Sequence, residues 1–104
     1  METMERGSAV KERRVWKYPV LIQEEVVLSL PVGWQFLTVQ IQGPDQEIPR
    51  PEAQAWFLVE PDAETETVSL CWFGTGHRIV GDVGYLGTVQ VYGGSLVFHL
   101  FRRF

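Results

Sequence analysis

Most of this chain consists of short apolar segments separated by turn-forming residues, and this arrangement limits the folds that the chain can adopt. No segment shows the sustained apolar stripe of an amphipathic helix. Within residues 34–42, Leu37, Val39 and Ile41 alternate with polar residues, the pattern of a half-buried antiparallel strand. The predicted strands are Val15–Tyr18, Leu21–Leu30, Trp34–Gln42, Ala53–Glu60, Thr67–Phe73, Tyr85–Tyr92 and Ser95–Phe101. We therefore predict an all-β fold, a small antiparallel β-sandwich or barrel of six to seven short strands.

Proline and glycine add detail to this prediction. Pro19 has no backbone N–H, so it suits an edge strand or a strand end. Gly93-Gly94 separates the last two predicted strands, and two adjacent glycines favour a two-residue hairpin turn with positive φ. We predict that residues 21–30 are extended up to a turn at residues 30–33.

Charge is distributed unevenly along the 104 residues, a length that suffices for one domain. Residues 1–14 are polar and aperiodic, so we predict a flexible leader there and a single β domain over residues 15–104. Residues 1–17 hold five of the nine basic side chains, whereas residues 18–101 hold two basic side chains against ten acidic ones. Such a body cannot neutralise a row of phosphates, and general nucleic-acid binding is therefore disfavoured.

A glycine-rich string at residues 74–79 is the strongest candidate for a binding site. Its glycines would let backbone N–H groups converge on an anion, and an arginine would grip phosphate or carboxylate with two hydrogen bonds. The string lacks the Gly-Lys-Ser/Thr ending of a Walker loop and the strand–helix–strand unit of a dinucleotide fingerprint. The predicted ligand-binding residues are Gly74, Thr75, Gly76, His77 and Arg78, with Trp72, Tyr85 or Tyr92 stacking on a ring. The alternative is a connecting loop whose glycines serve turn geometry alone.

The sequence lacks the residue patterns that catalysis or metal binding would need. His77 and His99 have no companion carboxylate motif, and zinc requires three or four ligands. We interpret His99 as an outward-facing structural residue of its strand. Cys71 alternates with apolar neighbours, which favours packing over a nucleophilic role. We predict no catalytic residues, no metal and no cofactor.

Cellular location follows from two simple features. A single cysteine allows no internal disulfide, which favours a reducing, cytoplasmic environment. The longest apolar run is about six residues, against the roughly 20 that a membrane-spanning helix needs. We therefore predict a cytoplasmic protein without a membrane association.

Two predicted strands are apolar on both faces. In residues 53–60, Trp56 and Leu58 alternate with further apolar side chains, and residues 95–101 show the same pattern. Because a two-layer protein of this length has one interior, the surplus predicts a subunit interface or a ligand groove. We expect a homo-oligomer, and we interpret Phe101–Phe104 as a tail that docks on a neighbour.

Several strings between Trp16 and Phe101 match a known pattern. They are Tyr18-Pro19, Leu30-Pro31-x-Gly33, Leu37-x-Val39-Gln40-x-Gln42, Trp56-x-Leu58-Val59-x-Pro61, Gly74-Thr75-Gly76-His77-x-Ile79, Gly87-Thr88-x-Gln90 and Leu96-Val97-Phe98-His99. Gly-Thr-Gly-His and Leu-Val-Phe-His are the most specific. Together the strings resemble a family of small proteins of unknown function from phages and prophages. The resemblance implies a phage-associated protein in the host cytoplasm and supplies no activity.

Our leading hypothesis is a non-enzymatic, phage-associated binding protein. It would sequester a small anionic ligand, such as a nucleotide-derived host defence signal, and thereby counter host immunity. Tight binding suffices for this role, so a chain without an acid–base pair can perform it. The alternatives are a protein–protein inhibitor of a host factor, a virion structural module, and a hydrolase that uses His77 or His99 as its base.

Overall fold

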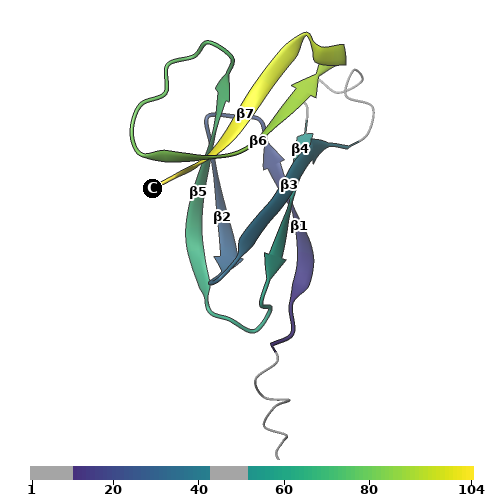
Figure 1. The fold of residues 1–104 in the computed structure, drawn as a ribbon, viewed down its shortest axis with the longest axis vertical. Helices are drawn as coiled ribbons and strands as arrows, with labels where there is room; N and C mark the ends of the chain where they lie inside the picture. Colours follow the sequence, from purple (N-terminus) through teal and green to yellow (C-terminus); the bar gives the residue numbers. More distant parts are fainter. Residues whose placement is uncertain (1–10, 43–51) are drawn as a thin grey trace, which may run out of the picture.

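The computed structural model describes residues 11–42 and 52–104, so the predicted leader of residues 1–14 lies mostly outside the described part of the chain. Strands dominate this part (Figure 1). They are β1 (Arg14–Leu21), β2 (Glu25–Pro31), β3 (Gln35–Ile41), β4 (Glu52–Val59), β5 (Thr65–Gly74), β6 (Val83–Val91) and β7 (Leu96–Arg103). A 3-10 turn, η2 (Tyr92–Gly94), connects β6 to β7.

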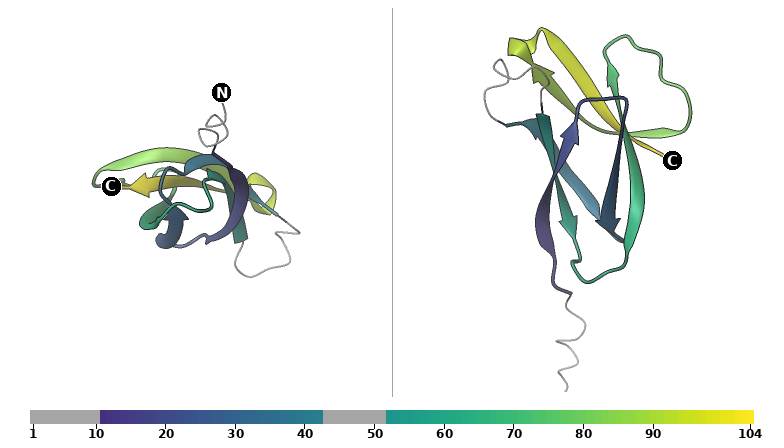
Figure 2. Two further views of the ribbon diagram at one scale, coloured as in Figure 1. Left: turned by 90° about the horizontal axis from the view of Figure 1, so that it is seen from below. Right: turned by 180° about the vertical axis from the view of Figure 1, so that it is seen from behind.

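The strands form two antiparallel sheets that pack face to face (Figures 1 and 2). The first sheet has the order β1-β4-β3, and the second has the order β2-β5-β7-β6. Most pairings join segments far apart in sequence, such as Trp16 with Phe57 and Leu70 with Arg102. The predicted all-β antiparallel fold is confirmed, and the architecture is a sandwich.

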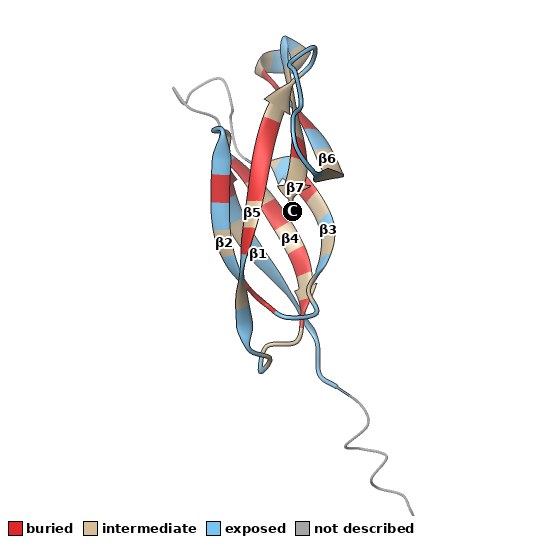
Figure 3. Ribbon diagram, turned by 90° about the vertical axis from the view of Figure 1, so that its left-hand side faces the viewer, coloured by how far each residue is buried: buried red, intermediate tan, exposed pale blue. Residues whose placement is uncertain are grey.

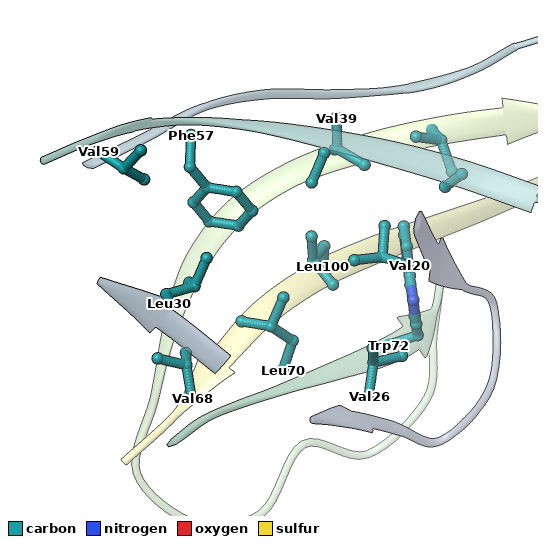
Figure 4. Packing of buried hydrophobic residues seen from close by; sticks show 13 residues of the cluster. Val20, Val26, Leu30, Val39, Phe57, Val59, Val68, Leu70, Trp72 and Leu100 are labelled. Carbon is teal, nitrogen blue, oxygen red and sulfur yellow. The ribbon is translucent and has the colours of Figure 1, made fainter. Parts of the chain in front are cut away.

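The hydrophobic core lies between the sheets and includes Phe57 of β4 (Figures 3 and 4). Every second residue of β4 from Ala53 to Val59 is buried, and the residues between them are half-buried on the other face. The Phe57 ring is met edge-on by three aromatic rings at centroid distances of 5.6–5.7 Å, those of Tyr18, Trp34 and Phe36. Such pairs contribute about 0.5–1.5 kcal/mol each beyond the area they bury. The predicted two-faced character of this strand is confirmed.

The prediction of one extended segment over residues 21–30 is wrong. The chain bends at residues 22–24 and passes from the first sheet to the second. Val20 before the bend and Val26 after it both belong to the core, and no proline or glycine lies between them, although residues 23–25 are Gln-Glu-Glu. Pro19 lies within β1 opposite Gln54, and β1 is an edge strand, which confirms the expectation for a residue without an N–H.

The hairpin between β6 and β7 is longer than predicted. Val91 pairs with Leu96, which leaves four residues in the loop rather than two. Gly93 and Gly94 have φ values of 67° and 93°, so the predicted positive φ is confirmed at both. Tyr92 also adopts a positive φ, of 53°, which is uncommon for a residue with a side chain. No glycine signalled this extra position.

The end of the chain continues β7 and belongs to the domain itself. Arg103 pairs with Ser69 of β5. The Arg102 guanidinium lies 4.8 Å from the ring centroid of Trp34 and 4.9 Å from that of Phe104, a cation–π arrangement. Residues 101–103 of this ending are therefore part of a strand of the domain, and its docking on a neighbour stays a prediction.

Candidate functional site

A loop of residues 75–82 joins β5 to β6 and carries most of the predicted binding string (Figures 1 and 2). Strands β5 and β6 both run antiparallel to β7, which lies between them. The chain must therefore return along the length of the sheet before β6 begins. Two hydrogen bonds hold the returning chain: Arg103 Nη1 donates to the Val80 carbonyl at 3.2 Å, and the Phe104 N–H donates to the Asp82 carbonyl at 2.9 Å.

The first part of the loop is a tight turn closed by His77. Its N–H donates to the Gly74 carbonyl at 3.0 Å, and its Nδ1 accepts from the Gly74 N–H at 3.2 Å. Because Nδ1 is the acceptor, Nε2 carries the hydrogen of the neutral ring. A Cβ at Gly74 would lie 2.9 Å from the imidazole, so glycine is needed there for space. At Gly76 the reason is φ, which is 88°.

A groove of about 680 Å³ opens between this loop, the β1–β2 bend and the end of β5. Pockets of about 300–1,000 Å³ commonly hold small molecules. Its charged residues come from three separate segments: Glu24 and Glu25, Arg78, and Arg103. Its aromatic residues are Trp72, Phe73 and Phe98. The groove thus combines two guanidinium groups, two carboxylates and apolar walls.

Half of the eight predicted site residues line this groove, namely Trp72, Gly74, His77 and Arg78. Thr75 lines an adjoining hollow, whereas Gly76, Tyr85 and Tyr92 line neither. Trp72 is only 6% exposed and belongs to the core, which leaves little of its ring for stacking. Its indole Nε1 is buried without a hydrogen-bond partner among the described residues.

Sequence reasoning missed three charged groove residues, Glu24, Glu25 and Arg103. They lie about fifty residues before the string and about twenty-five after it. The strand order of the second sheet brings them together, because β2 and β7 flank β5 on its two sides. No local pattern in the sequence reports that pairing.

A chain of hydrogen bonds on the outer face of the second sheet connects the loop to β6 and β7. Thr75 Oγ1 lies 2.8 Å from His99 Nε2, and Thr88 Oγ1 lies 2.9 Å from His99 Nδ1. The Tyr85 hydroxyl lies 2.5 Å from Thr88 Oγ1. Three of the strings that carry the family resemblance therefore meet here. The expectation that His99 faces outward is confirmed. Its two hydrogen-bond partners could not be predicted from the sequence.

Aromatic rings and a buried thiol occupy the same face further along β7. The Phe101 ring meets Phe73 and Tyr85 edge-on, at centroid distances of 5.6 and 5.5 Å. The Cys71 side chain is 1% exposed, and its thiol lies 3.7 Å from the Phe101 carbonyl. Burial raises the pKa of the Cys71 thiol, although the nearby Arg103 opposes this. The geometry supports the packing interpretation of this cysteine.

Two further observations concern the described residues alone. No three His, Cys, Asp or Glu side chains within residues 11–42 and 52–104 are grouped so that they could hold a metal ion. In the same residues, no helix has the length and apolar character that crossing a membrane requires.

A known family matches most of the chain. Residues 11–104 match the family model "Domain of unknown function (DUF7352)". This span includes all seven strands, the loop and the groove. Neither the curated proteins nor the solved structures include a match to the chain.

Proposed function

The chain belongs to the DUF7352 family, and on that premise we propose that it is a non-enzymatic binding protein that holds a small anionic ligand of the nucleotide class. The observation that carries this proposal is the convergence of Arg78 and Arg103 on one groove. Arg78 lies in the loop between β5 and β6, whereas Arg103 lies in β7, far from it in the sequence. Their joint presence favours an anionic ligand.

Arg78 has the features of a ligand-binding arginine. It is exposed, and it forms no hydrogen bond or ion pair with another described residue. Arg103 is held by the Val80 carbonyl at 3.2 Å, so its position is fixed before a ligand arrives. Guanidinium groups match phosphate geometry with paired hydrogen bonds. We propose that the unpartnered Arg78 and the anchored Arg103 bind the same phosphate.

Two carboxylates in the groove limit the kinds of ligand that can bind there. Glu24 and Glu25 line the same groove as the arginines, and Glu25 accepts a hydrogen bond from the Ser69 hydroxyl at 2.5 Å. A simple polyanion would be repelled by these groups. A nucleotide carries both a phosphate and hydrogen-bond donors on its base and sugar, and Phe73 and Phe98 supply apolar surface for the base. This mixed lining favours a nucleotide over a bare phosphate.

Binding without turnover agrees with the chemistry of the nearby groups. His77 Nδ1 already accepts the Gly74 N–H, and both nitrogens of His99 are engaged with threonine hydroxyls. The Cys71 thiol is buried. A general base or nucleophile must instead be free to reach the substrate. These engagements support sequestration.

We further propose a biological setting that rests on the resemblance to phage proteins. A phage protein that captures a nucleotide-derived host signal would lower its free concentration in the host cytoplasm and so counter host immunity. No reaction is needed, because mass action alone sets the free ligand level.

Calorimetric titration with 5′-AMP and 5′-GMP tests the proposal. We expect Arg78→Ala to weaken binding about tenfold or more, because hydrogen bonds to charged groups contribute roughly 1.5–3 kcal/mol. Arg13→Ala is the matched control, since Arg13 is exposed and lies outside the groove. Equal nucleotide affinity of the two variants, or no binding by the wild-type protein, would refute the proposal. Conversion of the nucleotide during the titration would favour the hydrolase alternative.

A specific surface favours a second candidate, an inhibitor or structural module that binds another protein. Trp56 and Leu58 are half-buried on the outer face of the first sheet, beside Val15, which is 54% exposed. A partner captured in equal stoichiometry would support this candidate if Trp56→Ser abolished capture and Arg78→Ala left it unchanged.

A further inference from the structure

A second hollow of about 440 Å³ adjoins the groove at the start of β7. It shares Gly74, His77 and Phe98 with the groove. The His77 ring, fixed over Gly74 by the hydrogen bond to Nδ1, therefore forms part of the boundary between the two spaces. The two spaces therefore adjoin one another.

The second hollow differs from the groove in chemistry. Its walls include Leu96, which is 46% exposed, and Val97. Its two hydroxyls are already engaged: Ser95 Oγ donates to the Tyr92 carbonyl at 3.0 Å, and Thr75 Oγ1 pairs with His99. None of its lining residues is an arginine or a carboxylate. The hollow is suited to a flat, weakly polar group such as a nucleobase.

We infer that the ligand has two linked parts, and that it is a dinucleotide whose second base occupies the hollow beside His77. This inference rests on the proposed function. Each space lies within the range of about 300–1,000 Å³ that commonly holds a small molecule, so each is large enough for one part of a two-part ligand. The charged groove takes a nucleotide with its phosphate, and the weakly polar hollow takes the other base.

His77 is positioned to act at the link between the two parts. Because Nδ1 accepts from Gly74, the neutral ring keeps a hydrogen on Nε2. No other described residue bonds to that nitrogen. It can therefore donate to a phosphate oxygen that bridges the two spaces, which gives the ligand a defined orientation.

The test compares 5′-AMP with the 5′-phosphorylated dinucleotide pApA by calorimetric titration. Because covalent linkage makes the second contact intramolecular, we expect pApA to bind at least tenfold more tightly than AMP. Leu96→Asp should remove that gain and leave AMP binding unchanged. Leu37→Asp is the matched control, since Leu37 is similarly exposed, at 42%, and lies outside both spaces.

Amide chemical shifts provide a second readout that does not depend on a variant. The signals of residues 95–97 should move with pApA and stay in place with AMP. Equal affinity for the two probes, or a loss of the gain in Leu37→Asp as well, would overturn the two-part ligand while leaving the proposed function intact. Failure of both probes to bind would refute the proposed function, and this inference with it.

Discussion

Gly74 and His77 form a matched pair that closes the turn at the start of the loop between β5 and β6. The glycine was predicted because glycine backbones bind anions, yet its N–H is taken by His77 Nδ1. The structural reason for glycine is the imidazole that lies over it. The sequence drew attention to both residues but could not predict this contact, because it depends on a side chain that folds back across three residues.

Replacement of Gly74 by alanine tests this pairing. The added Cβ would lie 2.9 Å from the His77 ring, so the ring must move and the hydrogen bond to Nδ1 must break. We expect the free energy of unfolding to fall by about 1–3 kcal/mol, the usual cost of overpacking. Urea unfolding measures the change. An alanine variant as stable as the unmodified protein would show that the ring has no fixed place.

Cys71 gives the protein an alkaline pH dependence. Burial raises the pKa of its thiol in the folded state, so the unfolded chain releases this proton at a lower pH than the folded one. Stability should therefore fall as the pH rises through the ordinary thiol pKa and continue to fall until the raised folded pKa is passed.

Urea unfolding between pH 7 and 10 measures this dependence. Cys71→Ala should show a shallower fall than the unmodified protein, although Tyr18 adds its own alkaline effect because burial also raises its pKa. Identical slopes with and without the cysteine would contradict the assignment.

Among the elements, β7 organises the site because it pairs with β5 on one side and β6 on the other. This position brings His99 between Thr75 and Thr88. Alternation along residues 95–101 predicted which way His99 faces. Its partners were beyond prediction, because they depend on which strands become neighbours in the sheet, and that order is set by long-range packing.

Thr75→Val tests how the chain of hydrogen bonds through His99 affects the loop of residues 75–82. Valine keeps the shape of threonine and removes the hydrogen bond to His99, at a cost of about 0.5–1.5 kcal/mol. We expect faster amide hydrogen exchange over residues 75–82. Thr67→Val is the control, because Thr67 is an exposed threonine of β5 outside the network. Similar exchange rates in the two variants would show that the network does not hold the loop.

For the whole molecule, composition and periodicity were enough to predict an all-β antiparallel fold but not whether it is a sandwich or a barrel. A sandwich and a barrel require the same alternation, and they differ in which edges close. Here Val39 of β3 would lie 2.8 Å from a Cβ at Gly87 of β6, so the two sheets approach closely along one side. Gly87 permits that approach. A lone glycine within a strand is typical of a close backbone approach, but it does not tell which strand approaches.

Self-association remains a prediction at this scale. The outer face of the first sheet exposes apolar residues that a single domain does not cover, including Leu58. We expect a dimer by light scattering after gel filtration, and a monomer for Leu58→Lys, because a buried unpaired charge is costly. Val27→Lys is the control on the second sheet, where Val27 is 59% exposed. A monomeric unmodified protein would contradict this expectation.

The central place of β7 in its sheet has a consequence for how the protein is made. Residues 96–103 are translated after the strands on both sides of them. Until they leave the ribosome, β5 and β6 have no common neighbour, and Arg103 cannot reach Val80. Nascent chains that stop before this point lack the strand that joins β5 to β6 and the second arginine of the groove, so we expect the groove to be complete only once β7 has been translated.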